Sequence, residues 1–238
     1  MTSQPNALAQ TADFEFAALN EAKNYRRALL RDFEPYLRGN VLEVGAGIGQ
    51  ITSELRQMPE IQKLLSIEPD AAFCARLRAR FPQHDLLQGT VGDLQSETDW
   101  NAILSINVLE HIEMDGEELA AYHHLLQPAR GALCLLVPAR PEIYAPIDKD
   151  FGHFRRYTRL ELRRKLEGAG FKLVRFRYYN FAGYFAWWVN FCLLKKRSFD
   201  VAAVRLFDRA IFPLVHGFES RICPPPIGQS LMAVAAAR

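Results

Sequence analysis

A glycine-rich segment near the start of the chain has the composition of a ligand-binding turn. Residues 43–49 read EVGAGIG and directly follow the apolar pair Val41 and Leu42. Glycines let the chain bend sharply after a strand and bring its backbone close to a ligand, as nucleotide-like cofactors require. A dinucleotide turn of the form G-x-G-x-x-G would need a glycine at position 50, where the chain has Gln50. The G-x-G-x-G spacing therefore argues against a nicotinamide-dependent oxidoreductase.

Two acidic residues further along the chain have the chemistry to complete such a site. Glu68 ends a second apolar run, and a carboxylate at the end of a parallel strand can accept hydrogen bonds from both hydroxyls of a ribose. The alternative is an exposed acid at the start of a helix that Asp70 caps. Asp93 follows Gly92 after a third short run; a Gly-Asp pair alone is a common turn.

A further motif, residues 105–112 (SINVLEHI), follows a fourth apolar run. Together with residues 43–49, Glu68 and Asp93, it resembles the motifs of class I S-adenosyl-L-methionine (SAM) methyltransferases. The resemblance implies that SAM is the cofactor and S-adenosyl-L-homocysteine (SAH) the product. It also implies that Glu68 binds the ribose, that Asp93 accepts from the adenine amino group, and that Glu43 organises the turn and the ammonium end of the cofactor. The implied cofactor-binding residues are Glu43, Gly45, Ala46, Gly47, Gly49, Glu68, Pro69, Asp93, Leu94, Asn107 and Val108.

Segment 105–112 also excludes some acceptors. It lacks the D/N-P-P-Y/F string of enzymes that methylate amino groups of nucleic acids, and it has no Pro-Cys nucleophile. The paired-glutamate loop of protein arginine methyltransferases is missing as well. With a formal net charge of only +2, the chain gives no general argument for nucleic-acid binding. We therefore expect no nucleic-acid partner.

Methylation of a hydroxyl group needs a base that takes the proton as the C–O bond forms, and histidine titrates in the useful range. Two histidines are candidates by position: His111 after the fourth apolar run and His153 after the fifth. In the alternative interpretation each of them only orders its loop or packs beside the cofactor. Glu110 and His111 offer two metal ligands, which are too few to predict a metal site.

The loop after residue 150 is more distinctive. Residues 152–157 read GHFRRY and resemble a bacterial subgroup of these methyltransferases, in which a Gly-His-x-Arg-Arg-Tyr loop precedes a helix, a strand and an asparagine, here Asn180. The window 153–177 holds nine arginines and lysines against two glutamates. Guanidinium groups suit a phosphate or carboxylate, so an anionic acceptor is expected, with loop anchoring as the alternative. The predicted substrate-binding residues are Arg155, Arg156, Tyr157 and Asn180.

An aromatic, apolar segment follows, at residues 181–194, and it ends abruptly at Lys195-Lys196-Arg197. Fourteen residues are too few to span a bilayer comfortably. Tryptophans beside an apolar face that ends in cations suit a helix lying in the membrane interface. A hydrophobic lid over the acceptor and a homodimer interface are the alternatives. In each case a large or lipid-like acceptor is expected.

The elements that position these residues alternate between strands and helices. Strands are predicted at 41–44, 63–67, 85–88, 102–106, 132–137, 172–178 and 230–235, and helices at 16–37, 49–58, 70–80, 110–126 and 159–169, with a loop after Pro138. Such alternation predicts an α/β, Rossmann-like fold with helices on both faces of a mostly parallel sheet. The methyltransferase resemblance implies seven strands with the last one antiparallel. We predict one domain, 1–238, with a helical hydrophobic insertion at 180–227.

Composition sets the remaining limits. The 238 residues are 49% apolar, enough for a sizeable core. The four cysteines form no C-x-x-C pair, which favours reduced, structural thiols, and the N-terminal residues show no secretory pattern. These features predict a cytoplasmic protein, with peripheral membrane contact as an option.

The sequence thus predicts a SAM-dependent methyltransferase that methylates an oxygen of a small-molecule, sugar or lipid-linked acceptor. The alternative is a catalytically inactive protein that keeps the methyltransferase fold and uses the aromatic insertion for binding or assembly. The intact acidic and glycine residues of the presumed cofactor site argue against this alternative.

Overall fold

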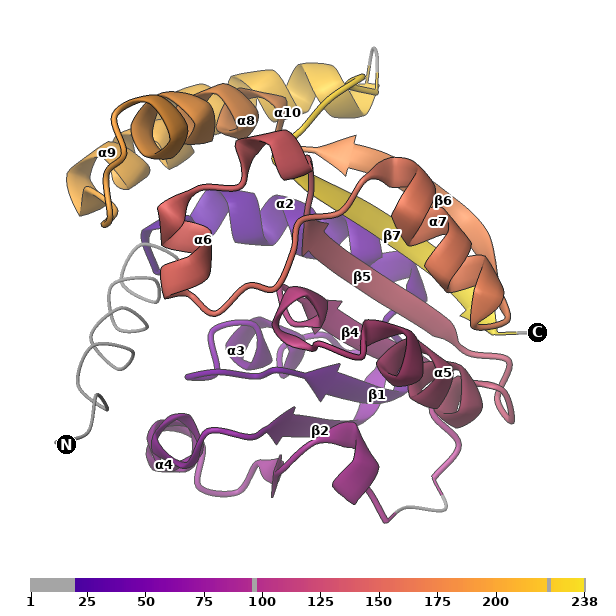
Figure 1. The fold of residues 1–238 in the computed structure, drawn as a ribbon. Helices are drawn as coiled ribbons and strands as arrows, with labels where there is room; N and C mark the ends of the chain where they lie inside the picture. The colour runs from indigo at the N-terminus through magenta and orange to yellow at the C-terminus, as the bar shows by residue number, and fades with distance from the viewer. Residues whose placement is uncertain (1–19, 96–97, 222–223, 238) are drawn as a thin grey trace, which may run out of the picture. The chain divides into compact units, whose positions relative to one another are not determined.

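The computed structural model describes residues 20–95, 98–221 and 224–237, and a seven-stranded sheet is its main feature (Figure 1). The strand order is β3-β2-β1-β4-β5-β7-β6. The strands are β1 (Gly39–Val44), β2 (Ile61–Glu68), β3 (Asp85–Gln88), β4 (Ala102–Ile106), β5 (Ala132–Pro138), β6 (Phe171–Tyr179) and β7 (Ser230–Ala237). The first five pair in parallel, and β7 runs antiparallel between β5 and β6. The predicted fold class is therefore confirmed.

The register of the parallel strands brings the ends of β1, β2 and β4 to the same edge of the sheet. Val44 at the end of β1 lies opposite Ile67 on β2 and Ser105 on β4. One residue earlier, Glu43 lies opposite Ser66. The loops after these three strands therefore leave the sheet side by side, at the carboxyl ends of the strands, where ligands of open α/β sheets bind.

Helices connect the strands. They are α2 (Lys23–Phe33), α3 (Thr52–Leu55), α4 (Ala71–Arg80), α5 (Asp115–Leu126), α6 (Pro146–Asp150), α7 (Arg159–Gly168), α8 (Phe181–Trp187), α9 (Val201–Leu206) and α10 (Phe212–Arg221). Two π-helical segments, η5 (Trp188–Leu193) and η6 (Phe207–Ile211), continue α8 and join α9 to α10. Short 3-10 turns occur at η1 (Glu34–Tyr36), η2 (Val91–Asp93), η3 (Leu109–His111) and η4 (Pro141–Ile143).

Three helix predictions and one loop prediction need correction. The first helix ends at Phe33 because Pro35 turns the following residues into η1, and residues 16–19 of the predicted helix lie outside the described part. Of the helix expected at 49–58 only α3 forms, since Gly49 has a left-handed φ of 79°. The helix expected from residue 110 begins at Asp115, because Ile112 is extended after η3. The loop predicted after Pro138 contains α6, which Pro146 starts at its first turn.

The chain divides into two compact units. One comprises residues 1–30, 138–158 and 177–231, and we call it the helical unit. The other comprises residues 31–137, 159–176 and 232–238, and we call it the sheet unit. In the sheet unit most residues of β1, β4 and β5 are buried, including Leu133–Val137, as expected for a covered parallel sheet. The described cysteines Cys74, Cys134 and Cys192 are free thiols, while Cys223 lies outside the described residues.

The helical unit has a small core of its own. Ile143, Ala145 and Ile147 pack against Trp187 and Phe191, which lie on one face of α8 and η5. In the same unit α8 packs against α10 (Figure 1). Within the described ranges, no helix combines the length and the apolar character needed to cross a membrane.

Candidate functional site

The glycine turn after β1 adopts a backbone conformation that side chains rarely allow. Gly45, Gly47 and Gly49 have φ angles of 76°, 55° and 79°. The amides of Gly45 and Ala46 both donate to the carbonyl oxygen of Ile67 at the end of β2, at 2.9 and 3.1 Å. A Cβ atom at position 45 would lie 2.3 Å from Cγ2 of Val108, in the loop after β4. The turn therefore needs glycine both for its conformation and for the close approach of these two loops.

The Glu68 carboxylate ties this turn to the next strand. Its Oε2 accepts from the Gly47 amide at 2.8 Å, and its Oε1 accepts from the Asp70 amide at 2.9 Å. Burial raises the pKa of Glu68, although the two amide hydrogen bonds oppose the rise. Each carboxylate oxygen can accept a second hydrogen bond, so both remain able to accept from a ribose hydroxyl. Pro69 is exposed. Asp70 caps α4 by accepting from the amides of Ala72 and Phe73, as the alternative interpretation of the sequence had it, but Glu68 itself is buried rather than exposed.

The predicted adenine-binding residue lies at the surface. Asp93 ends η2, and its Oδ2 accepts from the amide and the hydroxyl of Thr90, each at 2.8 Å. The hydrogen bonds from the Thr90 backbone and side chain lower the pKa of Asp93. The carboxylate is thus exposed, fixed in orientation and ionised, as an acceptor for an amino group should be. Leu94 follows in extended conformation.

Glu43 lies below the turn, almost completely buried at 2% exposure. Its Oε2 accepts from the Thr52 hydroxyl at 2.7 Å and from the Ser66 hydroxyl at 2.5 Å, and Ser66 Oγ is 2.8 Å from His84 Nε2. The other oxygen, Oε1, is buried and has no hydrogen-bond partner among the described residues. An unpartnered buried carboxylate oxygen beside a glycine turn fits a ligand with a cationic or donor group.

Burial raises the pKa of Glu43 to about 7, from 4.5, despite the hydrogen bonds from Ser66 and Thr52. Between these two values the folded protein holds a proton that the unfolded chain has lost, so Glu43 makes stability fall as pH rises through this window. We predict that the free energy of unfolding of the wild-type protein falls by about 3 kcal/mol as pH rises through this window, and that this fall is absent in Glu43→Gln. Urea unfolding of both proteins at pH 4.5 and at pH 8 measures the difference. Glu60→Gln, at an exposed position, is the control, and an unchanged pH slope in Glu43→Gln would contradict the assignment.

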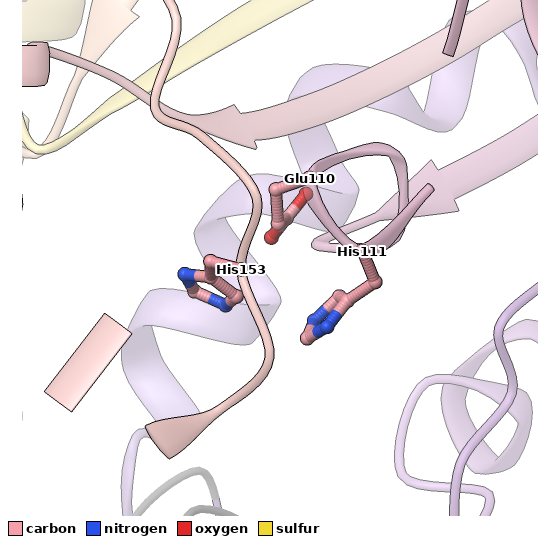
Figure 2. Close-up of side chains that lie close together, drawn as sticks. All are labelled: Glu110, His111 and His153. Carbon is pink, nitrogen blue, oxygen red and sulfur yellow. The ribbon is translucent and has the colours of Figure 1, made fainter. Parts of the chain in front are cut away.

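After β4 the chain forms a tight turn. Asn107 has a left-handed φ of 52°, and its amide donates to the Leu136 carbonyl at 2.9 Å. Leu109–His111 form η3, on which Glu110 is buried and His111 is exposed (Figure 2). The sheet unit therefore brings the loops carrying Glu43, Gly45, Glu68, Asn107 and Val108 to one edge, while Asp93 follows β3 next to them in strand order.

In the helical unit, His153 lies just after α6 (Figure 2). Its Nδ1 is 2.9 Å from Oδ1 of Asp148, a completely buried carboxylate on α6. The Asp148 Oδ2 accepts from the Ala145 amide at 2.8 Å. Burial favours the neutral acid, but the hydrogen bond from His153 and the charge of Arg156 lower the pKa of Asp148. In the neutral form of His153, an ionised Asp148 that accepts from Nδ1–H leaves the lone pair on Nε2.

The two arginines of the GHFRRY loop differ in their contacts. Arg156 is buried, donates from Nε to Asp148 at 2.8 Å and from Nη1 to the Ala139 carbonyl at 3.2 Å, and stacks on the Trp187 ring. These contacts are the ones expected from loop anchoring. The Arg155 guanidinium lies over the Phe154 ring, which is exposed. Tyr157 is fully buried and forms an isolated parallel β-bridge with Ala139.

Asn180 lies at the start of α8 in a left-handed conformation, with φ of 62°. Its Oδ1 accepts from the Gly183 amide at 2.9 Å, and its Nδ2 donates to Gln229 Oε1 at 2.8 Å. These contacts cap the helix and connect it to the chain before β7. These contacts explain why an asparagine stands at position 180 even if it does not bind a substrate.

Sequence reasoning missed four polar residues. Asp148 orients His153, and Ser66, Thr52 and His84 surround Glu43. For Asp148 a signal was present, because an acid at the third helical position after Ala145 and Pro146 is typical of a capped helix start. The partners of Glu43 carried no comparable signal.

Comparison with known proteins identifies the family. A family model described as a methyltransferase domain matches residues 15–175, more than half of the chain. Comparison with curated proteins gives no match. A chain of the complex between the Haloferax volcanii Trm112 methyltransferase activator and a methyltransferase has a TM-score of 0.64 and 16% identity, with 99% of both chains covered.

Two further solved structures share the fold. A SAM-dependent methyltransferase from Mesorhizobium loti has a TM-score of 0.60 and 15% identity, covering 87% of this chain and 95% of its own. The DhpI–SAH complex has a TM-score of 0.59 and 14% identity, covering 96% and 92%. With its Rossmann-like sheet and the family match, the protein belongs to the methyltransferase domain family.

Proposed function

We propose that this protein transfers the methyl group of SAM to an oxygen of a small-molecule, sugar or lipid-linked acceptor. The main support is the glycine turn of the sheet unit, whose three left-handed glycines are tied to Glu68 by the Gly47 amide. Two further observations support the proposal: the turn packs so closely on Val108 that a Cβ at position 45 would lie 2.3 Å from its Cγ2, and Oε1 of Glu43 has no hydrogen-bond partner among the described residues. Two of the solved structures with this fold are named for SAM or SAH.

The residues around the turn have separate tasks in this proposal. Glu68 accepts from the ribose hydroxyls, Asp93 accepts from the adenine amino group, and Glu43 faces the ammonium end. The cofactor supplies a methyl group that its sulfonium makes electrophilic. The protein therefore has to position the acceptor oxygen in line, exclude water and remove one proton.

His153 is the base in this proposal. Because Asp148 holds its Nδ1, Nε2 takes the hydroxyl proton as the C–O bond forms and the C–S bond breaks. Arg155 offers its guanidinium to an anionic group of the acceptor, whereas Arg156 anchors the loop through Asp148. His111 is the second candidate base.

Calorimetric titration with SAH and SAM tests the donor half of the proposal. We expect saturable binding of both at or below millimolar concentration. Absence of binding by the folded protein would contradict the proposal, and a rise in NADH fluorescence on titration would favour an oxidoreductase instead. Radiolabelled SAM separates an enzyme from an inactive binding protein, because only the enzyme moves the label into an acceptor.

A further inference from the structure

Large apolar side chains are exposed along one face of the first helix of the insertion. Phe185, Trp188, Val189 and Leu193 follow each other at intervals of three, one and four residues, which places them on one side of α8 and η5. The opposite side, with Trp187 and Phe191, is buried in the core of the helical unit. The helix is therefore apolar on two sides, and only one of them is covered by the described chain.

The last helix of the insertion repeats this arrangement. Ile211, Leu214 and Phe218 are spaced by three and four residues and are all exposed, Leu214 at 77%. Phe212 and Glu219, on another side of α10, are buried. Since α8 packs against α10, the two exposed stripes belong to one pair of packed helices. Monomeric soluble proteins rarely expose so many large apolar side chains together without a partner.

The acids and the cations of the insertion differ in their contacts, and this difference indicates the kind of partner. Its acids serve internal contacts: Asp200 caps α9, Asp208 accepts from the amides of Asn24 and Tyr25, and Glu219 accepts from the Phe181 amide. Its cations are all exposed, namely Lys195, Lys196, Arg197, Arg205, Arg209 and Arg221. Arg205 pairs with Glu21 and Arg197 with Asp150. Of the three acids only Asp200 is exposed, so the exposed charges of the insertion are mainly positive even after these two pairs are set aside.

We propose that these exposed faces, Phe185–Leu193 and Ile211–Phe218, bind the surface of a membrane that contains anionic lipids. Exposed tryptophan, phenylalanine and leucine can enter the boundary between headgroups and acyl chains, while the lysines and arginines bind anionic headgroups. A soluble protein partner would cover the apolar residues equally well, but it would not by itself account for the charges: among the insertion's described residues six cations are exposed and only one acid, Asp200. This inference stands apart from the donor site, which lies in the sheet unit.

Flotation with vesicles tests the proposal. The protein should float with phosphatidylcholine vesicles containing phosphatidylserine, and much less with phosphatidylcholine alone or at high salt. Trp188→Ser and Leu214→Ser should each weaken binding roughly tenfold, because each removes a large apolar side chain from the interface. Lys195→Glu/Lys196→Glu should weaken binding to the anionic vesicles. The matched control is Leu160→Ser, at an exposed leucine of α7 in the sheet unit.

Intrinsic fluorescence gives a second readout. Trp100 and Trp187 are buried and Trp188 is 45% exposed, so a blue shift with anionic vesicles should come from Trp188 and disappear in Trp188→Ser. Unchanged far-UV circular dichroism and thermal unfolding of each variant show that it is folded. Failure of the wild-type protein to float, or equal loss in Leu160→Ser, would overturn the proposal. So would formation of a dimer in sedimentation that Trp188→Ser abolishes, since the same face would then bind a second copy.

Discussion

A Glu68→Gln variant should bind SAH about 10- to 100-fold more weakly than the wild-type protein. The carboxylate accepts from two backbone amides, and the single amide oxygen of glutamine cannot replace both acceptor oxygens. The substitution also removes the charge that would strengthen a hydrogen bond from ribose. Hydrogen bonds to charged groups contribute roughly 1.5–3 kcal/mol, which gives the expected loss. Calorimetry with SAH measures it.

A double-mutant cycle separates ribose binding from support of the turn. Wild-type protein should bind SAH without its ribose hydroxyls much more weakly than SAH, whereas Glu68→Gln should distinguish the two ligands far less. Asp70→Asn is the control, because asparagine caps a helix as well as aspartate and the Asp70 amide still donates to Glu68. If the wild-type and Glu68→Gln proteins showed the same ratio of affinities for SAH and for SAH without its ribose hydroxyls, Glu68 would have a purely structural role.

The central strands were predictable because buried parallel strands are mostly apolar; β4, for example, begins and ends at the predicted residues 102–106. The edge strand β3 also has its predicted bounds, 85–88, although both of its end residues are exposed. The order of the strands was not predictable from pattern, since apolar runs do not encode which strands pair; the position of β7 came from the family resemblance. Helix boundaries failed where the backbone leaves the α region, as at Gly49 and Ile112.

For the site, the sequence predicted residues whose spacing is local, such as the three glycines and the acids that end strands. It could not predict that Glu43 lies opposite Ser66, because this depends on the register between β1 and β2. The role of Asp148 was missed for a different reason, because its local signal, an acid at the third position of a capped helix start, was not read. A stretch with Pro141 and Pro146 was expected to be a loop, yet a single helical turn there brings the carboxylate to His153 and Arg156.

His153 makes the strongest catalytic prediction. His153→Ala should lower turnover by about 100- to 10,000-fold, the usual contribution of a general base, without changing the affinity for SAH. The cofactor-binding residues predicted for this protein all lie in the sheet unit, whereas His153 and Asp148 belong to the helical unit. The assay follows transfer of radiolabelled methyl from SAM into a total lipid extract, which supplies lipid-linked acceptors.

Comparison of three histidines decides whether this assignment is correct. His111→Ala removes the other candidate base, and His124→Ala removes an exposed histidine of α5 that should have no effect. Loss of turnover in His111→Ala alone would move the role of base to the turn after β4. Full turnover in both His153→Ala and His111→Ala would mean that neither candidate histidine accepts the proton, and the proposed base would be wrong. Loss in His153→Ala alone would assign proton removal to His153, whose Nδ1 contacts Asp148.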